Sequence, residues 1–132
     1  MKYAILVRSA PAVSQAPTTA VHFARAAMAA GHEIVRIFFY QAGVLNALNT
    51  LCPAQDDALL PKAWHELAES GTELMVCAAS AARHGVLSAD EAKRYGHPHP
   101  TLDEAHFVVG GLGSWVEAVQ LVDRVLVFGD GR

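Results

Sequence analysis

Short apolar runs alternate with longer stretches of helical periodicity along the whole chain. The apolar runs lie at residues 3–7, 33–40, 73–77, 107–109 and 124–128. Their length suits β-strands, and their continuous apolar character suits strands that are covered on both faces. Strands that alternate with helices form βα units with right-handed crossovers. The sequence therefore predicts an α/β fold, a three-layer α/β/α sandwich around a mostly parallel sheet.

Helix signals separate these runs. Gly31 fits a helix stop, and the spacing from Ser88 to Glu91 fits a capping box. Asp56 or Asp57 is expected to cap the helix that precedes the third strand. The expected helices are 18–30, from about 57 to 69, 78–83, 88–96 and 113–122, with an irregular stretch at 41–53 that contains a helical turn at 44–48. No repeat, low-complexity tract or linker interrupts the 132 residues, so we expect a single domain over 1–132.

The charge pattern argues against a protein that grips nucleic acid. The net charge is −3, and the Lys and Arg residues are scattered, whereas phosphate binding needs a basic face. The first residues faintly resemble a signal peptide, but Arg8 ends the apolar run before a signal core of about 7–15 residues is complete. We therefore expect a first strand, no membrane span and a cytoplasmic protein.

Cys77 is the strongest candidate for a catalytic residue. It ends the third expected strand, and function in open parallel sheets gathers at the carboxyl ends of strands. The small residues at 78–82 are expected to leave the sulfur accessible, and the start of a helix favours a nucleophilic thiolate. Arg83 and His84 are expected to add positive charge. The alternative interpretation is a buried structural residue, because free cysteine is often buried.

The second cysteine, Cys52, lies in an irregular segment. The chain has no CxxC pair, and thiols are kept reduced in the cytosol, so both cysteines are predicted to be free. Cys52 could act as a resolving thiol for Cys77. We favour an incidental loop cysteine.

Two further motifs invite a binding site. His97 and His99, with His106, could face a metal ion, but no cysteine or carboxylate pattern completes a ligand set. We favour an exposed, extended loop and expect no metal. The segment 110–113 could receive a phosphate at the start of the last helix, yet it lacks the GxGxxG spacing, and close packing explains its glycines equally well.

The aromatic residues bear on packing and assembly. Trp64 is expected in the core because of its position in a helix, and Trp115 could be a core residue or an interface anchor. The run 38–40 at a strand end is hard to bury whole, so one of its aromatics is expected to face a partner subunit. Together with the apolar fraction of 52%, this run predicts that the chain self-associates or depends on partner subunits.

An ordered set of short matches to a known family covers nearly the whole chain. The set comprises Gln15, 30–33 (AGHE), 35–40 (VRIFFY), 43–44, 46–47, Pro53, 56–57, Trp64, Leu67, 76–86 (VCAASAARHGV), 111–113, 117–118 and 123–128. With a cysteine at the strand end, this order resembles the DsrE/TusD family of sulfur-relay proteins. Cys52, His84 and the histidine-rich loop depart from the family pattern.

The resemblance implies a five-stranded parallel sheet and a sulfurtransferase subunit. Cys77 would accept sulfane sulfur as a persulfide, without a metal or organic cofactor. The implied assembly is a heterohexamer with TusC/DsrF-like and TusB/DsrH-like paralogues. The implied acceptor is a TusE/DsrC-like carrier and the implied donor a TusA-like protein, with no direct contact to nucleic acid or membrane. Two pathways fit: 2-thiouridine synthesis at the tRNA wobble position, which we favour, and dissimilatory sulfur oxidation.

Two functions of other classes stay open. A non-catalytic assembly subunit would keep the fold and its subunit contacts, with Cys77 only structural. A flavodoxin-like mononucleotide binder would use the loop at 9–14, which has hydroxyl groups but no tight phosphate cradle.

Overall fold

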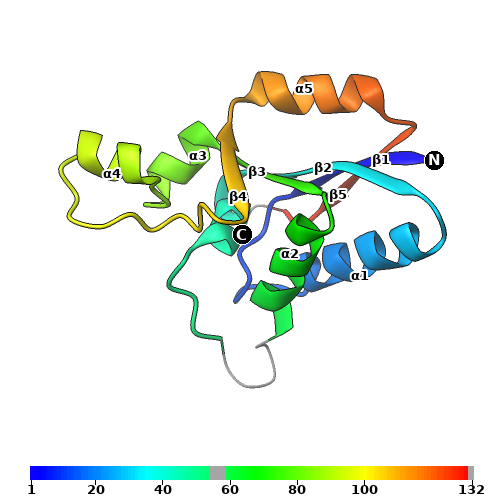
Figure 1. Cartoon of the computed structure of the whole chain (residues 1–132), viewed down its shortest axis with the longest axis horizontal. Coiled ribbons are helices and arrows are strands. Elements are labelled where there is room, and N and C mark those ends of the chain that lie inside the picture. Colours follow the sequence, from blue (N-terminus) through cyan, green and yellow to red (C-terminus); the bar gives the residue numbers. More distant parts are fainter. Residues whose placement is uncertain (54–58, 131–132) are drawn as a thin grey trace.

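The computed structural model describes residues 1–53 and 59–130, and within them a five-stranded, all-parallel sheet has the order β4-β3-β2-β1-β5 (Figure 1). The strands are β1 Lys2–Val7, β2 Glu33–Phe39, β3 Glu73–Cys77, β4 Phe107–Gly110 and β5 Arg124–Phe128. The helices are α1 Ala16–Ala29, α2 Leu59–Glu69, α3 Ala78–Arg83, α4 Ala89–Arg94 and α5 Leu112–Leu121, with a 3-10 helix η1 at Gln41–Ala47. None of the helices in this part of the chain is both long and apolar enough to cross a bilayer. The predicted α/β class with a mostly parallel sheet is confirmed.

Most predicted boundaries agree with the structure. β3, α3 and β5 have the predicted bounds. α1 begins two residues before the prediction, at Ala16, because Pro17 fits a first helical turn that needs no N–H from it. Gly31 follows this helix with φ +89°, a left-handed backbone that confirms the predicted stop. The capping roles predicted for Asp56 and Asp57 lie outside the described residues.

One face of the sheet packs against α1 and α2 and forms the main core (Figure 1). Side chains alternate between the two faces of each strand. The strand residues on this face are Ile5, Val7, Ile34, Ile37, Phe39, Leu74, Val76 and Phe107. Trp64 of α2 meets Phe39 edge to face, with ring centroids 5.0 Å apart. Trp64 is 1% exposed, which confirms it as a core residue.

The opposite face of the sheet is covered by α5 (Figure 1). Its buried cluster is smaller and consists of Phe38, Met75 and Cys77, with Leu6, Tyr40 and Trp115 packed against it. Arg36 fastens α5 to the sheet, because its Nη1 donates to the Ser114 carbonyl at 2.6 Å while its Nε pairs with Glu73. Trp115 thus belongs to this smaller cluster, half buried.

The aromatic run at 38–40 is not buried whole, as predicted, but two of its three side chains are. Phe38 and Phe39 are fully buried, because they point to opposite faces of the sheet and each face is covered. Only Tyr40 is partly exposed. Of the three aromatics, Tyr40 is therefore the one that is open to a partner subunit, and its contact with a partner stays a prediction.

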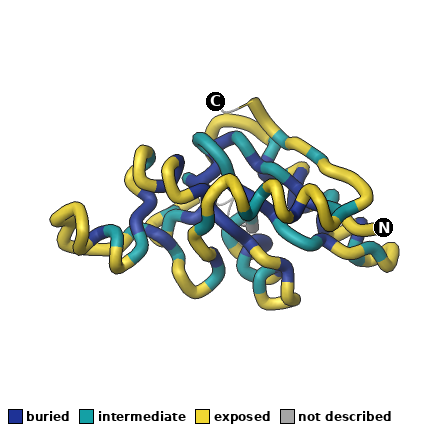
Figure 2. Tube along the Cα trace, turned by 90° about the horizontal axis from the view of Figure 1, so that it is seen from above, coloured by how far each residue is buried: buried dark blue, intermediate teal, exposed yellow. Residues whose placement is uncertain are grey.

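A different set of apolar side chains is exposed, on and beside α5. We call it the α5 surface, and its members are Val108, Leu112, Val116, Val119, Leu121, Val125 and Val127. Figure 2 views the molecule from the α5 side, where exposed segments run along this helix. A helix of a monomeric domain usually turns a polar face to solvent. An apolar outer face of this extent is typical of an interaction surface.

Candidate functional site: the carboxyl edge of the sheet

The carboxyl ends of β1, β2 and β3 lie side by side. Val7 pairs with Phe39, and Phe39 pairs with Val76. The residues that follow these strands are therefore neighbours at one edge of the sheet. Open parallel sheets place their functional sites at this edge.

Cys77 lies at this edge, as the sequence predicted. It is the last residue of β3 and the N-cap of α3, with an extended backbone at φ −65° and ψ 123°. The alternation along β3 places its side chain on the α5 face, in the cluster with Phe38 and Met75. The sulfur therefore lies between the sheet and the layer that α5 forms.

The prediction of an accessible sulfur is wrong for the single chain. Cys77 is 3% exposed, although Ala78 and Ala79 after it are exposed. The alternation of side chains along β3 directs the sulfur toward the α5 face of the sheet. There the side chains of Tyr40 and Trp115 pack against the cluster that contains it. Both rings are partly exposed, so they lie between the buried cluster and solvent.

A chain of polar contacts joins the three strand ends. Arg8 donates to Gln41 Oε1 from Nε and Nη2, at 3.1 and 2.9 Å. The Gln41 N–H donates to Ser80 Oγ at 3.0 Å, and Ser80 lies in α3, three residues after Cys77. Gln41 has φ +51°, a left-handed backbone that is costly for a residue with a side chain and that concentrates at functional sites.

Sequence reasoning missed Arg8, Gln41 and Ser80. A signal was present, because Arg8 and Gln41 follow the first two apolar runs and Ser80 lies in the first turn of the helix after Cys77. Which of the residues after a strand contact one another depends on turn geometry. The left-handed backbone at Gln41 could not be read from a glutamine.

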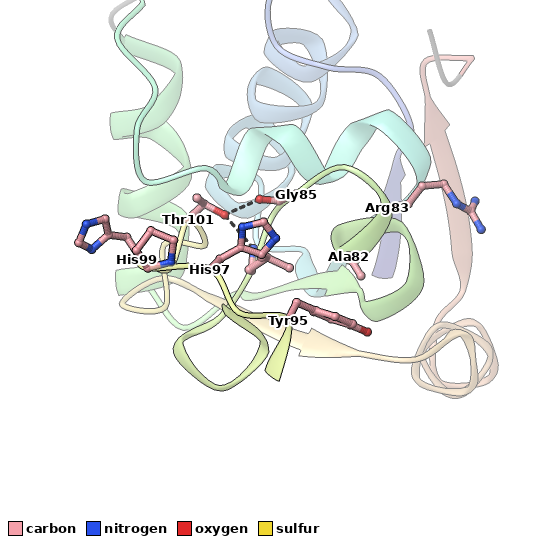
Figure 3. Close-up of a pocket in the computed structure, with 9 residues that line it drawn as sticks. Ala82, Arg83, Gly85, Tyr95, His97, His99 and Thr101 are labelled. Carbon is pink, nitrogen blue, oxygen red and sulfur yellow. Dashed lines mark hydrogen bonds between the residues drawn. The ribbon is translucent and has the colours of Figure 1, made fainter. Parts of the chain in front are cut away.

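The structure shows where the side chains of Arg83 and His84 lie, which the sequence left open. His84 Nδ1 lies 2.9 Å from the Ser80 carbonyl oxygen. Arg83 is exposed and lines the rim of a cavity of about 850 Å³ with Ala82, Tyr95 and His97. Figure 3 shows the Arg83 side chain extending away from the histidine side of this cavity.

The histidine-rich loop is exposed, as predicted. His97 and His99 both lie on the surface, and Figure 3 shows the His99 ring pointing away from His97. Thr101 closes the loop by donating from Oγ1 to the Gly85 carbonyl. His106 is not brought to this pair; it contacts Asp103 instead, with Nδ1 2.8 Å from Oδ2. The structure thus places His106 away from His97 and His99, with which the sequence prediction had grouped it.

Cys52 and Cys77 lie on opposite sides of the sheet. Cys52 is exposed and lines a cavity of about 610 Å³ with His22 and Arg25 of α1. Cys77 lies under the α5 layer. This separation does not favour a resolving role for Cys52 toward Cys77.

Burial predicts two distinct thiol reactivities. In the native protein, a chromogenic disulfide reagent should modify Cys52 rapidly and Cys77 slowly, because exchange requires access to the sulfur. In urea both thiols should react at similar rates. Stopped-flow absorbance measures the two phases. In a Cys52→Ser variant the fast phase should vanish and the slow phase remain; a fast phase that persists there would contradict the buried position of Cys77.

The chain is similar to known proteins that share one family. The model of the DsrE/DsrF-like family matches residues 1–128. A sulfurtransferase TusD homolog of Pseudomonas aeruginosa is 47% identical, with all of both chains covered. A putative sulfurtransferase DsrE of Allochromatium vinosum is 41% identical, covering 98% of this chain and 100% of the relative. The sulfurtransferase TusD of Salmonella newport is 40% identical, covering 97% and 100%.

The fold has solved counterparts. The ychN protein of E. coli superposes with a TM-score of 0.74 at 17% identity, covering 97% of this chain and 99% of that one. The protein MTH1491 of Methanobacterium thermoautotrophicum has a TM-score of 0.65 at 15% identity, covering 96% and 97%. These two likenesses concern the fold alone. The family match over 1–128 and the full-length relatives show that this chain belongs to the DsrE/DsrF-like family.

Proposed function

We propose that this chain is a sulfurtransferase subunit that holds sulfane sulfur as a persulfide on Cys77. The observation that carries the proposal is the position of Cys77, at the carboxyl end of β3 and the start of α3, beneath Trp115. Full-length relatives named as sulfurtransferases support the general class.

The chemistry is exchange between thiols and persulfides. The Cys77 thiolate attacks the outer sulfur of a donor persulfide, the donor S–S bond breaks, and the donor thiolate leaves. The new S–S bond makes Cys77 the persulfide. An acceptor thiolate then attacks that outer sulfur and releases the Cys77 thiolate, so two exchanges conserve electrons and need no cofactor.

Burial fits the task of carrying a labile sulfur. A persulfide at an exposed site would lose its outer sulfur to small thiols, since exchange rates depend on access. At Cys77 the cluster with Phe38 and Met75 excludes solvent. The partly exposed rings of Tyr40 and Trp115 are the side chains that would move to admit a partner's cysteine. We propose that the donor or acceptor protein opens this layer on docking.

The proposed partners follow from the family. We propose a heterohexamer with TusC/DsrF-like and TusB/DsrH-like subunits, a TusA-like donor and a TusE/DsrC-like acceptor, all in the cytoplasm. The favoured pathway is 2-thiouridine synthesis at the tRNA wobble position, because the relative of highest identity given above is named a TusD homolog. The DsrE relative at 41% identity supports sulfur oxidation as the second candidate pathway.

Mass analysis tests the carrier role. After treatment with a donor protein that carries a persulfide and can open the layer over Cys77, the intact chain should gain the mass of one sulfur atom, and the gain should map to the peptide that contains Cys77. A gain found only on Cys52 would contradict the proposal. No gain on a folded chain in complex with its paralogues would favour a non-catalytic assembly subunit.

We expect subunits to associate through the α5 surface. Replacing Val116 and Val119 by lysine should weaken assembly strongly, because charge is depleted at the centres of interfaces. Both side chains are exposed, at 54% and 39%, so the fold should be retained. Sedimentation velocity of the chain alone and with its paralogues measures the effect.

A matched control uses an exposed valine far from this surface. Val13 is 61% exposed and lies in the loop after β1, so Val13→Lys should leave assembly unchanged. If the wild-type chain stays a monomer even with its paralogues present, the interface assigned to the α5 surface does not exist.

A further inference from the structure

Two histidines and one aspartate converge between α2 and the turn before β4, away from the sulfur site. His65 Nε2 lies 3.0 Å and His106 Nδ1 lies 2.8 Å from the same oxygen, Asp103 Oδ2. One potential ligand atom from each of the three residues lies within 4.8 Å of the other two. Glu69 adds a second carboxylate, with Oε1 3.6 Å from His106 Nε2.

This set of donors matches a metal site better than the histidine-rich loop does. Two imidazole nitrogens and one carboxylate oxygen are a common ligand set for Zn²⁺ and other first-row divalent metals, with positions left for water or a further ligand. The side chains of His65, Asp103 and His106 are 39%, 15% and 21% exposed, so an ion could reach them. Glu69 and His106 also line an adjoining cavity of about 300 Å³.

We propose that His65, Asp103 and His106 bind a divalent transition-metal ion, and Zn²⁺ is the probe we choose for it. Zinc bonds to nitrogen and oxygen are about 2.0–2.2 Å long. The three donor atoms must therefore move until each lies at that distance from the ion. The rings of His65 and His106 stack with centroids 3.9 Å apart and an angle of 10° between their planes. In two parallel rings the nitrogen lone pairs lie in parallel planes, so they cannot both point at one ion. The ring of His65, the most exposed of the three side chains, therefore turns on binding.

The ligands come from two parts of the fold. His65 lies in α2, whereas Asp103 and His106 lie in the turn that leads into β4, an edge strand of the sheet. Asp103 also holds this turn, since its N–H donates to the Ala47 carbonyl at 2.8 Å and Oδ1 accepts from the Ala105 N–H at 3.2 Å. A bound ion would fasten α2 to the start of the edge strand.

The proposed metal site is separate from Cys77. Cys77 pairs with Gly110, the last residue of β4, whereas His106 precedes the first residue of that strand. The ion therefore has a structural role at the amino end of the sheet. The proposal departs from the sequence-based expectation that the chain holds no metal, but it leaves unchanged the expectation that sulfur transfer itself needs none.

The experiment is calorimetric titration of the full, untagged chain with Zn²⁺. The wild-type chain should bind about one equivalent, and its Tm should rise, because a ligand that binds only the native state stabilises it. His65→Ala should weaken binding at least about tenfold, the lower end of what even an outer-shell change costs, and should remove the rise in Tm. Asp103→Asn, which conserves volume, should weaken it likewise.

The controls separate this site from other zinc ligands in the chain. The double variant His97→Ala, His99→Ala and the double variant Cys52→Ser, Cys77→Ser should both retain the binding and the rise in Tm. As a measurement that needs no variant at the site, NMR of the wild-type imidazoles should show the His65 and His106 signals shifting with Zn²⁺ while those of His97 and His99 stay. Absence of zinc binding, or shifts confined to other histidines, would overturn the proposal.

Discussion

Replacing Cys77 by serine is expected to abolish persulfide formation and to reduce sulfur transfer to background. The outer sulfur must be bonded to a thiol sulfur, and a hydroxyl forms no persulfide. The measurement is transfer of labelled sulfur from a persulfide donor through the chain to a TusE-like carrier. Because Cys77 supplies the only thiol of this chain in the proposed mechanism, no partial activity is expected.

The variant should fold, although its new hydroxyl is placed at a buried position. Cys77 is buried, and a hydroxyl left unpaired there would cost about 1–3 kcal/mol. Serine, however, is a favoured N-cap, worth about 1 kcal/mol over alanine, and Cys77 occupies the N-cap of α3. The Cys77 side chain makes no cap hydrogen bond, so the serine hydroxyl offsets this cost by turning toward an N–H of the first turn. Cys77→Ala, which adds no polar group, is the second variant.

Cys52→Ser is the matched control for the loss of a thiol. Cys52 is exposed on the opposite side of the sheet, so this variant should transfer sulfur at nearly the wild-type rate. Circular dichroism spectra of the three variants show whether each is folded. Full transfer by folded Cys77→Ser protein would leave the chain as an assembly subunit, and loss of transfer in both serine variants would indicate a two-cysteine mechanism.

The sequence predicted the backbone of the site well. The apolar run at 73–77 and the alanine-rich segment at 78–83 have opposite local preferences, so the boundary between β3 and α3, and with it the place of Cys77, follows from nearest neighbours along the chain. β5 was found for the same reason, as an isolated apolar run after a helix.

The side-chain surroundings of the site could not be predicted in the same way. Whether Cys77 is open or buried depends on Trp115, which α5 brings over the sheet from 38 positions further along the chain. Likewise, His106 was grouped with His97 and His99 because they are close in sequence, while its true neighbours are Asp103 and His65 of α2. Contacts between elements that are far apart in the sequence are set by how the layers pack. They could not be inferred from a single sequence.

Replacing Trp64 by alanine is expected to lower the free energy of unfolding by about 3–5 kcal/mol, the usual cost of truncating a buried tryptophan. Trp64 is 1% exposed and packs edge to face on Phe39. A domain of this kind is stable by only about 5–15 kcal/mol, so the variant loses a large part of its stability. Urea denaturation followed by circular dichroism measures the change.

The tryptophan also reaches the functional edge through a buried asparagine. Trp64 Nε1 donates to Asn46 Oδ1 at 3.3 Å, and Asn46 Nδ2 donates to the carbonyls of Ser9 and Gly43 at 3.0 and 2.9 Å. Asn46 therefore ties η1 to the end of β1. A side chain at Gly43 would collide with the Val7 carbonyl oxygen, so these segments lie in close contact.

Trp64→Phe separates the hydrogen bond from the packing. Phenylalanine keeps most of the apolar contact but leaves Asn46 Oδ1 unpaired, so the expected loss is about 1–3 kcal/mol, well below that of alanine. Lys62→Ala, on the exposed side of α2 at 71% side-chain exposure, should change stability by less than about 0.5 kcal/mol. Equal losses for the phenylalanine and alanine variants would show that the Asn46 contact, rather than burial, dominates at Trp64. A loss below about 1 kcal/mol for alanine would contradict the place of Trp64 in the core, because deleting so large a buried ring leaves a cavity.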